Sequence, residues 1–306
     1  MSSPILASLH QLTIEIGDIP ILIRTDNPDF AYLLEARYGE FVTAEAPRAV
    51  IKLEIELVKE AAFGIEDSGF VKDGEDLSVR LESGRWVMER SDYRAEWDPQ
   101  NHQGWVRQSA NPYAIDGVLR IMHSLVLARE GGFLVHAASA VRNGCAFVFA
   151  GVSGAGKTTL ARLAPPDVIL LTDEISYVRP MGGSRGSGVR SSEIPSRHVP
   201  NRRSTIDNRQ SYEAFGTPFA GELARLGRKV RAPLRTLFLL KQGAENRIEP
   251  LSEGQAAREL LRHVLFFARD EELVAMVFQT VCDFVRRVPV RRLVFTPEAR
   301  VWELIT

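Results

Sequence analysis

The amino-acid sequence predicts an α/β protein, α+β overall, with a strand–loop–helix core preceded by a smaller, mostly β domain. Three observations predict this class. A glycine-rich loop at 151–158 separates an apolar strand from a helix start, short apolar–polar alternations fill the first 110 residues, and apolar strands alternate with helical repeats from 111 to 306. With 306 residues, of which 45% are hydrophobic, the chain is long enough for two domains, which we place at 1–110 and 111–306.

The first domain is predicted to be an antiparallel sheet, because apolar and polar side chains alternate there with a period of two. Turn residues such as Ser83-Gly84 separate neighbouring strands. The predicted strands are 12–16, 21–23, 49–55, 77–81, 86–88 and 94–97, and a short helix is predicted at 30–37. No residue pattern in this domain indicates a chemical function.

A helix is predicted to begin at Asn111-Pro112 and to end near Arg129, with one apolar face. Gly131-Gly132 ends it. Two strands follow, 133–141 and 145–150, joined by the turn Arg142-Asn143-Gly144. The second strand leads directly into the glycine-rich loop.

The loop Gly151-Val152-Ser153-Gly154-Ala155-Gly156-Lys157-Thr158 matches the pattern G-x-x-x-x-G-K-[ST] in full. Its glycines allow successive N–H groups to point at a phosphate chain, with the N-terminus of the next helix behind them. Lys157 is expected to reach the β- and γ-phosphates of ATP, and Thr158 to offer its hydroxyl to Mg²⁺. The alternative is a glycine-rich turn that matches by chance. The predicted ATP-binding residues are Gly151, Ser153, Gly154, Ala155, Gly156, Lys157, Thr158 and Thr159.

An acidic pair, Asp173-Glu174, follows the next apolar strand, 168–171, after one threonine. A carboxylate at the end of such a strand can face the Mg²⁺ of a bound nucleotide. Two adjacent acids allow two tasks. The alternative is a solvated turn after a buried strand.

Two basic stretches follow the acidic pair. Residues 181–210 carry six arginines against two acidic residues in surroundings rich in Gly, Ser and Pro. Such a segment buries little apolar surface, so we expect a mobile loop that holds an acidic substrate or closes over ATP. Lys229 and Arg231 precede a strand at 234–240 and are candidate phosphate or substrate contacts. For both stretches the alternative is solvated charge without a catalytic task.

The C-terminal part is predicted to provide packing elements. A capping box at Ser252-Glu253-Gly254-Gln255 opens one amphipathic helix, a second spans about 270–287, and a last strand covers 290–295.

Composition excludes several classes of partner. A formal net charge of −1 gives no basic field for nucleic acid, and no apolar run approaches the roughly 20 residues needed to span a bilayer. The two cysteines, Cys145 and Cys282, lack metal-binding spacing, which fits a reducing compartment. We therefore expect a cytoplasmic protein, and a homo-oligomer stays open.

From about Gly132 to Thr306 the chain resembles the HPr kinase/phosphorylase family, and most closely its divergent relatives described as HPr-kinase-related serine kinases. The resemblance is carried by the strand Leu134-Val135-His136-Ala137-Ala138 one hairpin before the loop, by the loop itself, and by an acidic pair that starts 16 residues after Lys157. The ending Val301-Trp302-Glu303-Leu304 is also similar. The resemblance implies a phosphate-loop core shared with phosphoenolpyruvate carboxykinase and phosphoryl transfer from ATP, or in some members pyrophosphate, to a protein serine.

The same resemblance implies roles for individual residues. Asp173 would be the base that accepts the serine proton, and Glu174, which stands where better-known members carry a second aspartate, would hold Mg²⁺ with Thr158. His136 would lie near the γ-phosphate and orient the catalytic acid, with a buried structural histidine as the alternative.

The leading hypothesis is therefore an ATP- and Mg²⁺-dependent kinase that phosphorylates a serine of a protein or peptide, with Asp173, His136 and Lys157 as catalytic residues. Two alternatives stay open. One is a nucleotide-dependent sensor that binds ATP without turnover. The other is a small-molecule kinase or carboxykinase-like enzyme on the same core.

Overall fold

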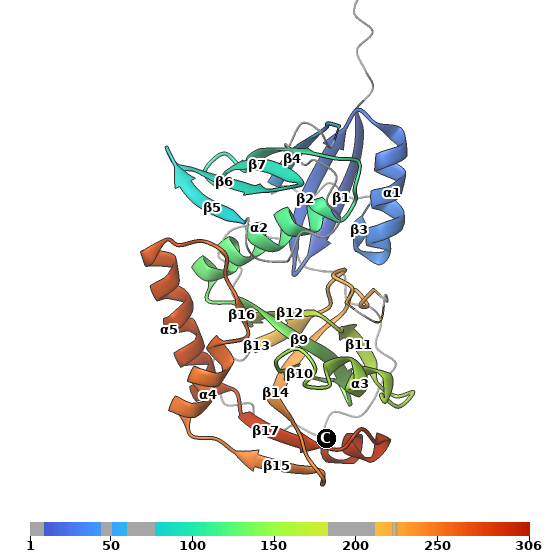
Figure 1. Cartoon of the computed structure of the whole chain (residues 1–306), viewed down its shortest axis with the longest axis vertical. Helices are drawn as coiled ribbons and strands as arrows, with labels where there is room; N and C mark the ends of the chain where they lie inside the picture. Colours follow the sequence, from blue (N-terminus) through green and yellow to red (C-terminus); the bar gives the residue numbers. More distant parts are fainter. Residues whose placement is uncertain (1–8, 44–50, 60–76, 183–211, 222, 224–225) are drawn as a thin grey trace, which may run out of the picture.

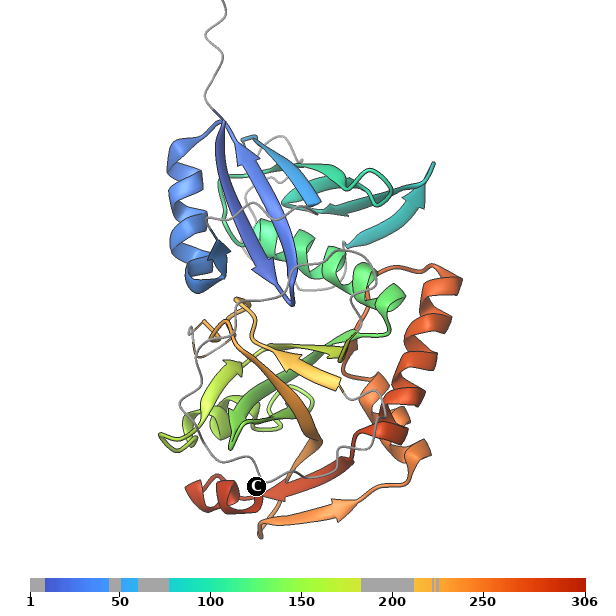
Figure 2. The same ribbon diagram turned by 180° about the vertical axis from the view of Figure 1, so that it is seen from behind.

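The computed structural model describes residues 9–43, 51–59, 77–182, 212–221, 223 and 226–306. Figure 1 shows an N-terminal sheet above a second body built around a closed barrel, with the helix α2 (Ala114–Glu130) between them. The view from behind in Figure 2 shows the same order of layers.

The N-terminal sheet has eight strands in the order β3-β1-β2-β4-β8-β7-β6-β5. Its pairs β2–β4 and β4–β8 are parallel and the others antiparallel, so the predicted all-antiparallel pairing is only partly right. The predicted strands are present among the described residues, whereas β3 and β8 were missed: β3 has two residues, and the sequence of β8 has little alternation. The strands are β1 (His10–Ile16), β2 (Ile19–Thr25), β3 (Val42–Thr43), β4 (Ile51–Leu57), β5 (Ser78–Glu82), β6 (Arg85–Arg90), β7 (Tyr93–Asp98) and β8 (Gln103–Gln108).

Two helices pack against the strands of this sheet. The helix α1 (Pro28–Tyr38) confirms the helix predicted at 30–37; the side chain of Asn27 caps it by accepting a hydrogen bond of 2.9 Å from the Phe30 N–H. The short η1 (Gly39–Phe41) follows. Tyr38 donates a hydrogen bond of 2.7 Å to Asp116 of α2, which ties the two helices together.

The second body is a ring of five strands, β10-β9-β12-β13-β14, closed because β10 also pairs with β14. The strands β17 and β15 extend the sheet from β14, while β11 and β16 pair with β9. The strands are β9 (Phe133–Arg142), β10 (Cys145–Ala150), β11 (Ile169–Thr172), β12 (Ile175–Pro180), β13 (Tyr212–Phe215), β14 (Arg231–Gln242), β15 (Arg247–Pro250), β16 (Val264–Leu265) and β17 (Val290–Phe295). The helices are α3 (Lys157–Arg162), α4 (Glu253–Leu261), α5 (Glu271–Arg287) and η3 (Ala299–Leu304).

The predicted α/β fold class is wrong. The protein is mostly β, an eight-stranded mixed sheet and a closed five-stranded barrel with few helices, and the described residues show no α/β phosphate-loop core. The prediction assigned the glycine-rich loop and the apolar strands of the second body to an α/β phosphate-loop core. Only β10–β14 and β14–β17 pair in parallel there. An apolar run shows that both faces of a strand are buried, and a closed barrel meets that condition as well as a parallel sheet does.

One continuous apolar core joins the two bodies. It contains Ile14 of the N-terminal sheet, Leu119 of α2 and Tyr177 of β12. Because α2 packs against β8 on one side and β9 on the other, its position is fixed relative to both. The domain boundary after residue 110 stays a prediction.

Two further expectations concern membrane-spanning segments and the Arg-rich loop. None of the described helices combines the length and the apolarity needed to cross a bilayer. Apart from Met181 and Gly182, the predicted Arg-rich loop at 181–210 lies outside the described residues.

Candidate functional site

The glycine-rich loop leaves β10 and enters α3 with the backbone that its glycines were predicted to allow. Gly154 and Gly156 have φ angles of +77° and +103°, in a region that L-residues with a Cβ avoid. A Cβ on Gly156 would also lie 2.5 Å from Cζ of Phe295. The loop is closed at its far end by β14, whose Gln242 donates a hydrogen bond of 2.7 Å to the Gly154 carbonyl.

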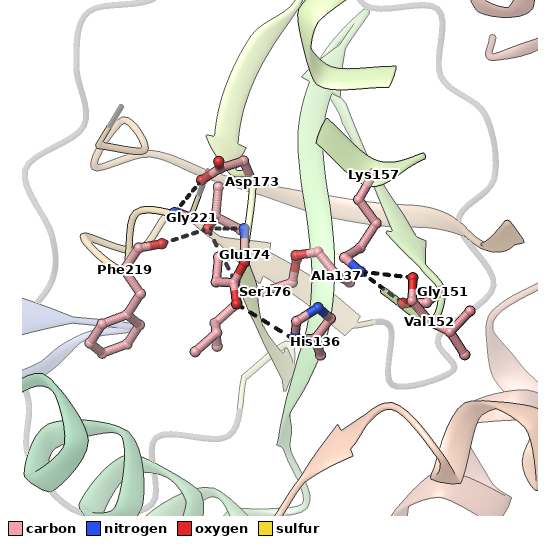
Figure 3. Close-up of polar contacts among 12 residues, drawn as sticks. His136, Ala137, Gly151, Val152, Lys157, Asp173, Glu174, Ser176, Phe219 and Gly221 are labelled. Carbon is pink, nitrogen blue, oxygen red and sulfur yellow. Dashed lines mark hydrogen bonds and ion pairs between the residues drawn. The ribbon is translucent and has the colours of Figure 1, made fainter. Parts of the chain in front are cut away.

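Lys157 folds back over this loop. Its side chain is buried, and its Nζ donates hydrogen bonds of 2.8 Å to the Gly151 carbonyl and 3.3 Å to the Val152 carbonyl (Figure 3). The ammonium group is therefore held at the start of the loop, where it is available to a phosphate that the loop amides bind.

The strand β9 places the predicted residues beside one another. Its residue Ala137 pairs with Ala150, the last residue of β10 before the loop. On the other edge of β9, the Ala137 N–H donates a hydrogen bond of 3.0 Å to the Glu174 carbonyl. The pairing of β11 with β9 shifts by one residue after Leu170, and from there Thr172 lies opposite Ser139 in the same register that places Ile175 of β12 opposite His136. The acidic pair lies between the end of β11 and the start of β12. It is next to Ala137, whose other neighbour, Ala150, directly precedes the loop.

The two acids of the pair point to different partners. Asp173 is 2% exposed, and its two carboxylate oxygens accept hydrogen bonds of 2.9 Å from the N–H groups of Gly221 and Leu223. The neighbouring Thr172 hydroxyl donates a hydrogen bond of 3.3 Å to the Phe219 carbonyl. Asp173 thus holds the segment that starts at Phe219, whereas Glu174 faces the loop.

His136 lies between Lys157 and the acidic pair in the view of Figure 3. Its Nδ1 is 3.6 Å from Oε1 of Glu174. Burial lowers the pKa of His136, and the positive charges of Lys157 and Arg120 lower it further. His263, whose carbonyl accepts a hydrogen bond of 2.8 Å from the His136 N–H, has its pKa lowered by burial and by Lys157. Both imidazoles are therefore neutral at pH 7, so the contact of His136 with Glu174 is a polar contact between a neutral ring and a carboxylate.

These groups surround one cavity of about 490 Å³, within the roughly 300–1,000 Å³ of small-molecule sites. Of the predicted site residues, it brings together His136, Glu174 and most of the loop, and Asp173 does not line it. Its described lining residues are Arg120, His136, Ser153, Gly154, Gly156, Lys157, Thr158, Thr159, Glu174, Ala220, Gly221 and Gln242.

The other two predicted contacts lie elsewhere. Nζ of Lys229 is 3.6 Å from Glu15, and Arg231 pairs with Asp18 in the turn after β1. Neither residue lines the cavity. Both hold the barrel against the N-terminal sheet, a long-range pairing that the local charge run could not reveal.

Four described lining residues were missed by the sequence prediction: Arg120, Ala220, Gly221 and Gln242. Ala220 and Gly221 lie in the segment before β14, and Gln242 is the last residue of β14, two residues beyond the predicted strand 234–240. A Cβ on Gly221 would lie 2.6 Å from Oε2 of Glu174, so glycine is the residue that lets the chain pass this carboxylate. The sequence did not single out Arg120 as a site residue, because a basic residue on the polar face of an amphipathic helix is common.

The donor set suits a hard cation that arrives with a nucleotide. The Thr158 hydroxyl and the Glu174 carboxylate both line the cavity, and Mg²⁺ commonly uses one or two protein oxygens together with phosphates and water. The described part of the chain contains no group of three or more His, Cys, Asp or Glu side chains that could hold a metal ion.

Comparison with known proteins adds no assignment. No family model matches the chain. No curated protein matches it at a significant level.

Proposed function

We propose that this protein binds ATP with Mg²⁺ in the cavity beside 151–158 and transfers the terminal phosphoryl group to a hydroxyl, a serine of a protein or peptide. One observation carries the proposal. A phosphate-type loop with a buried lysine faces a carboxylate and a neutral histidine across a single cavity. Phosphoryl transfer needs little beyond positioning and charge neutralisation, and these groups could supply both.

The binding step rests on the loop. Its backbone would wrap the phosphates, and the Lys157 ammonium would exchange its two carbonyl partners for phosphate oxygens. Thr158 and Glu174 would hold the cation that arrives with the nucleotide. The helix α3 has six residues, so its dipole adds little to this site.

The choice of a serine acceptor rests on the resemblance of 132–306 to HPr-kinase-related serine kinases. The fold that this resemblance implied is not the one observed, so its support is local: the histidine strand, the loop and the acidic pair. A cytoplasmic location belongs to the same proposal and is supported by two cysteines, Cys145 and Cys282, that are both thiols.

One observation favours a second candidate, an ATP-dependent sensor without turnover. Asp173, the residue expected to accept the serine proton, has both oxygens occupied by backbone N–H groups. Transfer of the serine proton to Asp173 would have to compete with these two hydrogen bonds, which hold the chain at Gly221 and Leu223. The sensor therefore predicts ATP binding without phosphoryl transfer.

The test combines calorimetric ATP titration with transfer from radiolabelled ATP to a serine-containing peptide library. We expect Lys157→Ala to weaken ATP binding by about tenfold or more, because a hydrogen bond to a charged group contributes roughly 1.5–3 kcal/mol. Lys52→Ala, an exposed lysine on β4, is the matched control and should bind normally. Full-strength binding by Lys157→Ala would overturn the site assignment, and binding without any transfer to peptides would favour the sensor.

A further inference from the structure

The guanidinium of Arg120 reaches the cavity from outside the phosphate loop. It projects from α2, shares the lining with His136 and Glu174, and lies with its central carbon 5.0 Å from the centre of the Phe219 ring. The barrel supplies the other described walls. The position of Arg120 therefore depends on how α2 docks between the two bodies (Figure 1).

Arg120 contacts the Phe219 ring, but it forms no ion pair with a described carboxylate. Its Nε–H is buried and donates no hydrogen bond, and among the described residues no hydrogen bond or ion pair reaches this side chain. By contrast, two other arginines form ion pairs with acidic residues of α2, Arg37 with Asp116 and Arg179 with Glu130. An unpaired buried guanidinium donor is costly unless an anion binds to it.

The position of Arg120 in the cavity indicates which phosphate of a bound nucleotide it would contact. Arg120 and Lys157 both lower the pKa of the His136 imidazole, so the two positive charges act on the same small region. This region is also where Glu174 faces the loop. Under the proposed function, the terminal phosphate is the group that lies next to the acidic pair, so it is the phosphate that Arg120 would meet.

We infer that Arg120 binds the terminal phosphate of the nucleotide and stabilises it during transfer, as a second cation delivered by α2. This inference rests on the proposed function. In the step, the acceptor hydroxyl oxygen forms a bond to the γ-phosphorus while the bond from phosphorus to the β–γ bridging oxygen breaks. The electron pair leaves on ADP, and the hydroxyl proton passes to a carboxylate of the acidic pair. The guanidinium stays bonded to the peripheral oxygens of the transferred group, where charge shifts most.

The experiment compares ATP and ADP affinities of the full chain by calorimetry, for Arg120→Met, Arg120→Lys and the exposed α2 arginine variant Arg129→Met as control. We expect Arg120→Met to weaken ATP binding roughly 10- to 100-fold while ADP binding changes less than about twofold. Phosphoryl transfer should fall by on the order of 10³. Arg120→Lys should recover part of the ATP preference, and Arg129→Met should behave as wild type.

Other results would overturn the inference. Equal losses for ATP and ADP would place Arg120 nearer the inner phosphates or in the loop scaffold. Unchanged ATP affinity with a raised KM for the acceptor would assign it to the acceptor instead. Thermal unfolding without nucleotide shows whether Arg120→Met is folded, and the lysine variant preserves the test if it is not. Failure of the proposed function is distinguishable, because then the wild-type protein itself would bind no ATP, or would bind ATP without transferring a phosphoryl group.

Discussion

At the scale of single residues, the acidic pair divides two tasks between neighbours. Both carboxylate oxygens of Asp173 accept hydrogen bonds from the N–H groups of Gly221 and Leu223. Glu174 lines the cavity instead, with its Oε1 3.6 Å from Nδ1 of His136. The strand before them ends at Thr172 and the next begins at Ile175, so the pair lies where the alternation of a strand is suspended. Adjacent carboxylates can then have unrelated partners.

This division predicts different effects of two amide substitutions. Asp173→Asn places an NH₂ group against a backbone N–H and should cost roughly 1–3 kcal/mol of unfolding free energy, measured by urea denaturation. Glu174→Gln should change stability by less than about 0.5 kcal/mol, because the side chain is partly exposed, yet abolish transfer. A folded Asp173→Asn protein of wild-type stability without transfer would instead support Asp173 as the base.

At the scale of elements, α2 carries a buried histidine that the site does not use. His123 is 1% exposed, and its two ring nitrogens have no hydrogen-bond partner among the described residues. Its ring meets the Tyr177 ring edge to face, with centroids 5.6 Å apart. Burial lowers the pKa of His123 from 6.5 to about 3.

Between about pH 6.5 and pH 3, His123 is therefore neutral in the folded protein but protonated in the unfolded chain. The stability of the protein should be complete above about pH 6.5 and fall as the pH decreases toward 3. Between pH 7.5 and pH 4, His123 alone should remove roughly 3 kcal/mol of unfolding free energy, and the lowered pKa values of His136 and His263 act in the same direction.

The measurement is urea unfolding of His123→Leu at both pH values, with the exposed His102→Asn as control. The leucine variant should lose most of this pH dependence and the control none of it. An unchanged acid loss in His123→Leu would assign the effect to other groups.

At the scale of the whole molecule, a small number of polar contacts accompany the shared apolar core where the sheet meets the barrel. Arg179 of β12 is buried; it donates a hydrogen bond of 2.9 Å to the Gly17 carbonyl in the β1–β2 turn and lies 3.0 Å from Oε2 of Glu130. Beside it, Arg231 pairs with Asp18 of the same turn, but its side chain is 41% exposed.

These two contacts should differ in energy. Arg179→Met leaves a buried carbonyl and a partly buried carboxylate without their partner, so we expect a loss of roughly 2 kcal/mol in urea unfolding. The matched Arg231→Met should cost less than about 1 kcal/mol, because exposed pairs contribute little. Equal losses would indicate that apolar packing, rather than Arg179, fixes the turn.

The sequence predicted what local chemistry determines. The loop glycines, the Ser252 capping box and the Asn143-Gly144 turn all have the expected geometry. Closure of the barrel was not predictable, because the β10–β14 pairing joins strands more than 80 residues apart and apolar runs do not encode their partners. Arg120 was missed for the same reason, since its position in a helix does not show that the helix packs beside a cavity formed by distant strands and loops.

The strand β9 has a consequence for cooperativity. It is hydrogen-bonded to β10, β11, β12 and β16, so shifting it by one residue would break four ladders at once and would turn His136 to the opposite face. The loop start, His136 and Glu174 are all fixed by that one alignment. Because several ladders must separate before β9 moves, we expect these three groups to keep their spacing until the barrel unfolds as a unit.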